Sequence, residues 1–78
     1  PNPFNGETTI RFDVIERAPA RLRIMDMNGR VLRTLYDDVA APGSYALRFD
    51  AGDLSSGFYV IELHSGVHIL RRVMSLLK

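Results

Sequence analysis

Residues 58–77 read FYVIELHSGVHILRRVMSLL, and this stretch decides the fold. Apolar side chains recur at every second position ahead of the turn, at Tyr59, Ile61 and Leu63. A period of two puts them on one face of an extended strand, whereas a helix needs apolar residues three and four positions apart. The dipeptide Ser65-Gly66 is a tight-turn signal. The stretch therefore predicts an antiparallel hairpin with one buried face.

The expected turn also fixes how the two strands of this hairpin pair. A two-residue turn at Ser65-Gly66 sets Ile61 opposite Leu70. Counting in steps of two from Leu70 places three residues on the core side, namely Arg72, Met74 and Leu76. A charged side chain is unfavourable there, so we expect a bulge or an edge position near Arg72.

The rest of the chain alternates in the same way. Four further strands are predicted, at residues 8–14, 21–26, 30–36 and 44–49. Asn28-Gly29 is the dipeptide best suited to a type I′ hairpin turn, in which both central residues have positive φ. Residues 37–43 and 50–57 are expected to be loops, the second with Leu54 as a plug beneath it. Short strands at this spacing predict an all-β fold, a small immunoglobulin-like antiparallel β-sandwich of six to seven strands.

Size and composition narrow the possible functions. The 78 residues make a single domain spanning 1–78, expected to be excised from a longer secreted protein. A net charge of +1 gives no electrostatic field that would favour nucleic acid or an anionic membrane. No apolar run approaches the roughly 20 residues that a membrane helix needs. The chain has no cysteine, which excludes disulfides and cysteine-based zinc sites.

Candidate chemistry is sparse. His64 is expected to point outward and His68 to lie near a hairpin edge, so no zinc site is predicted. The stretch beginning at Asp26 lacks the later bidentate glutamate of a calcium loop, and a hairpin turn explains it better. Four loop acids are expected to be solvated, with a weak calcium site left open: Asp37, Asp38, Asp50 and Asp53. Ser55 and Ser56 have no histidine in their own segment, so we predict no catalysis, no cofactor and no small-molecule substrate.

Two surfaces remain as alternatives. Arg11, Arg21 and Arg23 are predicted on outward faces of neighbouring strands, as a solvated face or as a basic contact stripe for a partner. A glycan-binding platform needs exposed aromatic rings. There is no tryptophan, and only Tyr36 is expected to be free, so that function is weakly supported.

Five motifs in order then point to one family. They are PNPF before a Thr-x-Ile-x-Phe strand, an Asp-x-x-Gly-Arg hairpin, Gly-x-Tyr leading to an aromatic-Asp pair, Leu-x-Ser-Gly-x-Tyr, and a terminal hydrophobic strand ending in lysine. With these motifs the whole chain resembles the C-terminal sorting domain of cargo proteins exported by the type IX (Por) secretion system of Bacteroidetes-type bacteria. It is also similar to the immunoglobulin-like domain of flagellar hook-capping proteins.

The resemblance assigns residues to two groups. The motif positions expected to build the fold are Pro1, Asn2, Pro3, Phe4, Asp26, Gly29, Gly43, Tyr45, Asp50 and Leu54. The candidates for recognition by the export machinery are Gly57, Tyr59, Met74, Leu76, Leu77 and Lys78. The sequence departs from the family pattern at three positions: Met25 replaces an aromatic residue, Phe49 a tryptophan, and Val73 a lysine.

The resemblance implies a non-catalytic domain that directs an upstream cargo domain through the periplasm to the cell surface or the medium. Its implied partners are the outer-membrane secretion machinery and a sorting peptidase. We expect recognition by strand addition to the terminal strand. Deleting residues 76–78 is predicted to stop export while the trimmed domain still folds. The alternative is a structural immunoglobulin-like accessory domain that packs on a neighbouring enzyme or filament domain. A sorting domain must end its precursor, whereas an accessory domain need not.

Overall fold

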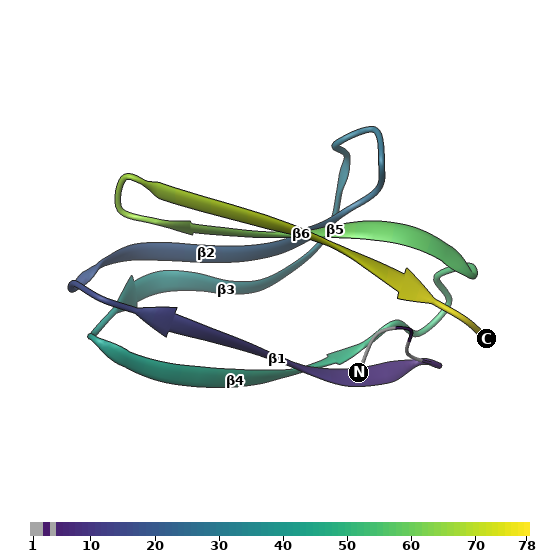
Figure 1. Cartoon of the computed structure of the whole chain (residues 1–78), viewed down its shortest axis with the longest axis horizontal. Helices are drawn as coiled ribbons and strands as arrows, with labels where there is room; N and C mark the ends of the chain where they lie inside the picture. The colour runs from purple at the N-terminus through teal and green to yellow at the C-terminus, as the bar shows by residue number, and fades with distance from the viewer. Residues whose placement is uncertain (1–2, 4) are drawn as a thin grey trace.

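The computed structural model of the chain describes Pro3 and residues 5–78, so the motif positions Pro1, Asn2 and Phe4 lie outside the described residues. Six strands follow one another (Figure 1): β1 (Glu7–Val14), β2 (Ala18–Met25), β3 (Val31–Ala40), β4 (Gly43–Asp50), β5 (Gly57–Ser65) and β6 (His68–Leu76). The described residues contain no helix, and hence none that could cross a membrane. The all-β prediction is confirmed.

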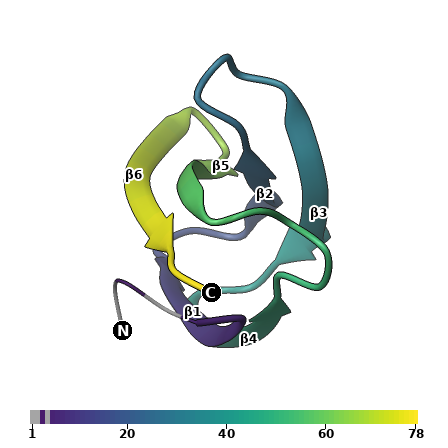
Figure 2. The same ribbon diagram turned by 90° about the vertical axis from the view of Figure 1, so that its right-hand side faces the viewer.

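The six strands form two antiparallel sheets. One contains β1 and β4, and the other has the order β3-β2-β5-β6. Figure 2 shows the small sheet at the bottom and the larger one curving over it. Only β2 and β5 have a strand on both sides, so β1, β4, β3 and β6 are all edges in the described part of the chain. The predicted sandwich is therefore present, with an open side between each pair of facing edges.

The core lies between the two sheets and follows the alternation of the sequence. Phe49 and Leu22 are each 1% exposed, and Ile24 is fully buried. They pack with the other inward residues of the two sheets, among them Ile10, Phe12, Val14, Tyr59, Leu63, Met74 and Leu76. Burial of such apolar side chains is the main force that stabilises a domain without disulfides.

The β2–β3 hairpin differs from the predicted type I′ turn. The Gly29 amide donates to the Asp26 carbonyl at 3.0 Å, and the Asp26 carboxylate accepts from the amides of Asn28 and Arg30, both at 2.9 Å. Gly29 has a φ of 86°, whereas no non-glycine residue of the described chain has positive φ. This pattern is a turn followed by one left-handed glycine, as in three-residue hairpin loops. The Asp26 side chain stabilises the longer loop and leaves Asn28 in ordinary φ.

The β5–β6 turn is displaced from its predicted position. Ser65 pairs with His68, so the two turn residues are Gly66 and Val67, and Leu63 rather than Ile61 lies opposite Leu70. The reason is conformational: the first residue of such a turn needs positive φ, and Gly66 supplies it at 59°. The displacement moves the register by two residues, so every side chain of β6 keeps its predicted face.

The expected loop at residues 37–43 is mostly strand. β3 continues to Ala40 and β4 begins at Gly43, which leaves only two residues between them. Asp37 pairs with Arg21 on the neighbouring strand, and buried Ala40 ends the strand at 1% exposure. Because β3 is an edge strand, its acidic side chains reach water without leaving the sheet. The prediction was wrong because acidic residues were read as loop signals.

Candidate functional site

The six recognition candidates come together where β5 begins and β6 ends. Gly57 lies opposite Leu76, and Tyr59 lies opposite Met74. Met74 and Leu76 face the core at 4% and 2% exposure, and Tyr59 is also buried. Their side chains therefore fix the position of the last strand. Exposed side chains at this end come from the final two candidates, Leu77 and Lys78.

Gly57 has a φ of 156°, a backbone conformation that residues with a Cβ rarely adopt. No atom lies within 4 Å of the place where a Cβ would sit on it. Close approach of another group therefore does not explain a glycine at this position.

The loop at residues 51–56 holds the end of the chain. The Lys78 amide donates a hydrogen bond to the Ser56 hydroxyl at 3.0 Å, and the Lys78 ammonium donates to the Gly52 carbonyl. The Tyr59 hydroxyl donates to the Ser55 carbonyl, in the manner of the tyrosine corner of β-sandwiches. We call residues 77–78 the tail. These bonds set the tail against the loop.

Other motif residues build the same region or the opposite end. The Asp50 carboxylate accepts a hydrogen bond from the Gly52 amide at 2.9 Å, and Leu54 packs on the core as the expected plug. Gly43 begins β4. The half-buried Tyr45 stacks on Phe12 with ring centres 5.1 Å apart. Pro3 is exposed.

Tyr36 is not the free aromatic side chain that the sequence suggested. Its ring is half-buried and lies 6.1 Å from that of Phe12 and 6.0 Å from that of Tyr45. The three rings come from β3, β4 and β1 and pack against one another. The ring of Tyr36 is therefore used in packing rather than in an exposed platform.

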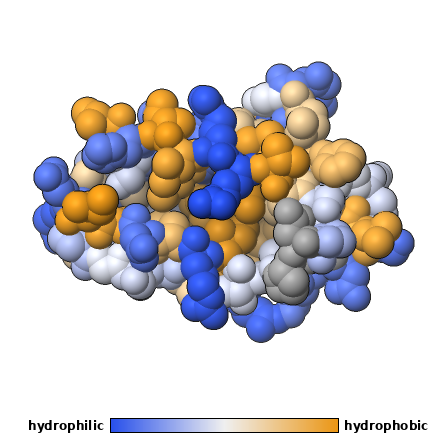
Figure 3. Space-filling model, viewed as in Figure 1, coloured by the Kyte–Doolittle hydropathy of each residue, from blue (hydrophilic) through white to orange (hydrophobic). Residues whose placement is uncertain are grey.

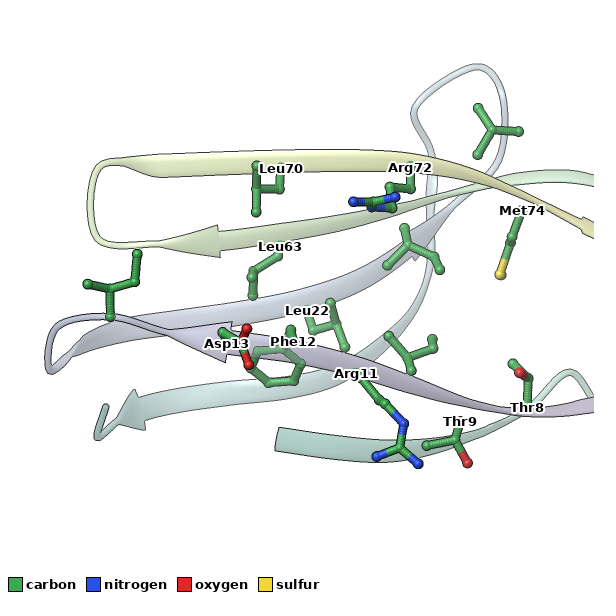
Figure 4. Close-up of a pocket in the computed structure, with 14 residues that line it drawn as sticks. Thr8, Thr9, Arg11, Phe12, Asp13, Leu22, Leu63, Leu70, Arg72 and Met74 are labelled. Atoms are coloured by element: carbon green, nitrogen blue, oxygen red, sulfur yellow. The ribbon is translucent and has the colours of Figure 1, made fainter. Parts of the chain in front are cut away.

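The opposite open side, between β1 and β6, holds a groove of about 830 Å³. Figure 4 shows Leu70, Arg72 and Met74 in a row along β6, with Leu63, Leu22 and Phe12 toward the floor. The predicted conflict at Arg72 is resolved by the edge position: the β5–β6 register has no bulge, and Arg72 is exposed at the groove. Leu70 is 63% exposed although it occupies a core-facing position.

The three arginines proposed as a stripe do not lie on one sheet. Arg11 is on β1 in the small sheet, whereas Arg21 and Arg23 are on β2 in the large one. Arg21 pairs with Asp37 in the strand register. Arg23 forms an ion pair with Glu62, and its guanidinium nitrogen lies 2.6 Å from the Glu62 carboxylate. The prediction of a basic stripe is therefore wrong.

Glu62 is the buried polar residue that sequence analysis missed. It is 4% exposed on the outer face of the large sheet, where its second carboxylate oxygen accepts from Arg71 at 2.8 Å. Arg23, Glu62 and Arg71 are neighbours across three strands, β2, β5 and β6. The sequence does hold opposite charges at these positions. They can be recognised as partners only once the strand order is known, because the order decides which positions face one another.

The two arginines change the acidity of Glu62. The hydrogen bond from Arg23 lowers the pKa of this carboxyl below its ordinary value of 4.5, burial acts in the opposite direction, and the hydrogen bond from Arg71 lowers the pKa further. The folded state therefore binds a proton less readily than the unfolded chain does. The stabilisation by the carboxylate is complete above about pH 4.5 and is lost as the pH falls through the lower folded-state pKa.

We expect Glu62→Gln to lower the free energy of unfolding by about 2 kcal/mol at pH 7, because two charge-assisted hydrogen bonds weaken and the partly buried guanidinium of Arg23 loses its counter-charge. Urea midpoints of both proteins between pH 7 and pH 3 measure this. The difference between the two urea midpoints should become smaller below pH 4.5. Glu16→Gln, at an exposed position, is the matched control and should change little. A gap that stays constant with pH would contradict the role given to the charge.

The acidic side chains and histidines do not converge. Asp37 and Asp38 lie near the β3–β4 turn, whereas Asp50 ends β4, an eight-residue strand that spans roughly 25 Å. Asp53 pairs with Arg33 at 3.3 Å. The two acidic pairs therefore lie at opposite ends of the sandwich. Among the described residues, no three histidine or acidic side chains are grouped to hold a metal ion.

Comparison with known protein families gives a match over almost the whole chain. A family model described as the secretion system C-terminal sorting domain matches residues 1–74. No curated protein and no solved structure matches the chain. The match covers the opening PNPF motif, all the strands through β5 and most of β6.

Proposed function

The chain belongs to the family of secretion system C-terminal sorting domains, and on that premise we propose that it directs an upstream cargo protein across the outer membrane by the type IX system. The family match over residues 1–74 is the observation that carries the proposal. The cargo enters the periplasm with a separate signal peptide and ends at the cell surface or in the medium. The sorting family is not a catalytic one, and the domain acts as an export signal.

We further propose that the machinery recognises the end of β6 and the tail. The support is geometric: β6 is an edge strand, so one side of its backbone pairs with no strand of the described chain. Strand addition uses such backbone groups for affinity and side chains for specificity. The exposed Leu77 and Lys78 supply side chains, while Gly57, Tyr59, Met74 and Leu76 hold the strand end in position. A sorting peptidase is the second proposed partner.

A reporter assay tests the proposed function. Residues 1–78 are fused to the C-terminus of a periplasmic reporter in a type IX-competent host. The reporter is expected in the medium or on the cell surface, because the domain supplies the export signal. The reporter without the domain, and the fusion in a host that lacks the type IX system, are the controls. Retention of the fusion inside competent cells would refute the sorting role and favour the accessory-domain alternative.

A further inference from the structure

The sandwich is incomplete on the side between β1 and β6. In Figure 1 these two strands lie nearest the viewer, and each has a described partner on its far side only: β4 for β1 and β5 for β6. The exposure of Leu70 indicates that a covering strand is absent on this side of the described chain. Leu70 faces the same way as buried Leu63, its partner on β5, yet it is 63% exposed. One more strand beside β6 would cover it.

The groove has the size and surface of a binding site for an extended segment. Its volume of about 830 Å³ falls in the range of ligand pockets. Figure 3 shows this face of the molecule with hydrophobic residues on both sides of a hydrophilic band. The apolar floor belongs to the core itself, with Phe12, Leu22 and Leu63 among the lining residues. A strand with alternating side chains would bury this surface.

The groove also carries an unpaired charge on β6. Arg72 is at a core-facing position of β6, and within the described chain its guanidinium has no ion pair or hydrogen bond. The other charged lining residues are engaged or directed elsewhere. Arg11 points away from β6 in Figure 4, and the Asp13 carboxylate accepts the Ser44 hydroxyl at 2.8 Å. A partner in the groove therefore meets a positive charge between two apolar positions, Leu70 and Met74.

We propose that the groove binds an extended segment of a partner protein, which adds to β6 as a strand and sets an acidic side chain against Arg72 between two apolar side chains. This inference rests on the proposed recognition at β6 and adds the chemistry of the partner strand. The acidic residue gives a charge-assisted hydrogen bond to the guanidinium. The flanking apolar residues cover Leu70 and the floor.

The charge of Arg72 argues against two other occupants. An inward-pointing charge on an edge strand disfavours a wholly apolar strand, because such a strand would leave the charge buried and unpaired. A second copy that paired its own β6 about the same point would bring two Arg72 side chains together, and like charges at facing positions are unfavourable. A partner strand with an acidic residue satisfies the site.

The probe is the peptide acetyl-Thr-Val-Thr-Glu-Thr-Val-Thr-amide. Its sequence is the same in both directions, so the test does not depend on whether the strand adds parallel or antiparallel. Titration into the full chain is followed by the NMR shifts of backbone amides. We expect shifts at β6 and along β1, and binding about tenfold tighter than that of the peptide with lysine at the centre.

Arg72→Glu should reverse this preference, so that the lysine peptide binds about tenfold tighter than the glutamate peptide. Arg17→Glu makes the same change in net charge at an exposed position between β1 and β2, outside the groove, and should keep the original preference. Equal urea midpoints of the variants and the parent chain show that folding is unchanged. Because Arg72 is exposed, we expect them to be equal.

Three results would overturn the inference. The first is that no amide shifts at millimolar peptide, and the second is that the glutamate and lysine peptides bind equally. The third is that amide shifts at β6 depend on protein concentration without any peptide, which would assign the groove to a second copy. The titration needs no export machinery. A failed titration with an exported reporter rejects the groove alone, and binding with a retained reporter rejects the sorting role alone.

Discussion

A chain shortened to end at Leu76 is expected to fold and yet to remain inside the cell. The tail contributes little to the core, because Leu77 is 63% exposed and Lys78 is bound through exposed hydrogen bonds to Ser56 and Gly52. Loss of such bonds costs about 1 kcal/mol. Export should fall to background, because the proposed recognition element is gone. Reporter in the medium and the urea midpoint of the isolated domain are the two measurements.

The deletion suggested by the sequence, residues 76–78, is a weaker test. Leu76 is 2% exposed, and removing a buried leucine side chain costs about 2–5 kcal/mol. Lost export would then follow from lost folding. A second variant keeps the length and replaces Leu77 and Lys78 with serine. Export of either variant at the parent level would refute recognition of the tail side chains.

Phe49→Ala is expected to unfold much of the population at 37 °C. Phe49 is among the largest fully buried side chains, and truncating a buried phenylalanine costs about 3–5 kcal/mol. A domain of this length has a total stability of roughly 4–12 kcal/mol at 0.05–0.15 kcal/mol per residue. The variant therefore loses a large share of its stability. The midpoint of urea unfolding, followed by circular dichroism, measures the loss.

Arg48→Ala is the matched control for this substitution. Arg48 is the preceding residue on β4, its side chain is 72% exposed, and its ion pair is with the half-exposed Glu7. Exposed ion pairs contribute up to about 1 kcal/mol. Similar midpoints for the two variants would show that the inner face of β4 is not the core that its burial indicates.

Period-two alternation predicted the number of strands and most of their buried faces, although the end of β3 was predicted as a loop. Tyr59 and Leu63 were assigned correctly to the buried face of their strand, because burial on one side of a strand imposes that period. Turn positions were harder. The hairpin at Asp26 and the turn at Gly66 each depend on local hydrogen bonds and on the sign of φ, which alternation does not encode.

The site was only partly predictable for a different reason. The recognition candidates adjoin because β5 and β6 are consecutive, so their pairing follows from one turn. The Arg23–Glu62 pair joins residues 39 positions apart, and the groove joins the first strand to the last. Such features depend on which strands are neighbours across the two sheets. A single sequence does not give that order.

The hydrogen bonds that tie Lys78 to the loop at residues 51–56 have a consequence for quality control. The tail holds its place only while that loop is formed, and the loop is formed only while Ala51 and Leu54 pack on the core. A receptor that reads the tail in this geometry thereby discriminates native copies from misfolded ones. If the tail is recognised as proposed, Lys78 therefore contributes to recognition and also makes recognition depend on the folded loop.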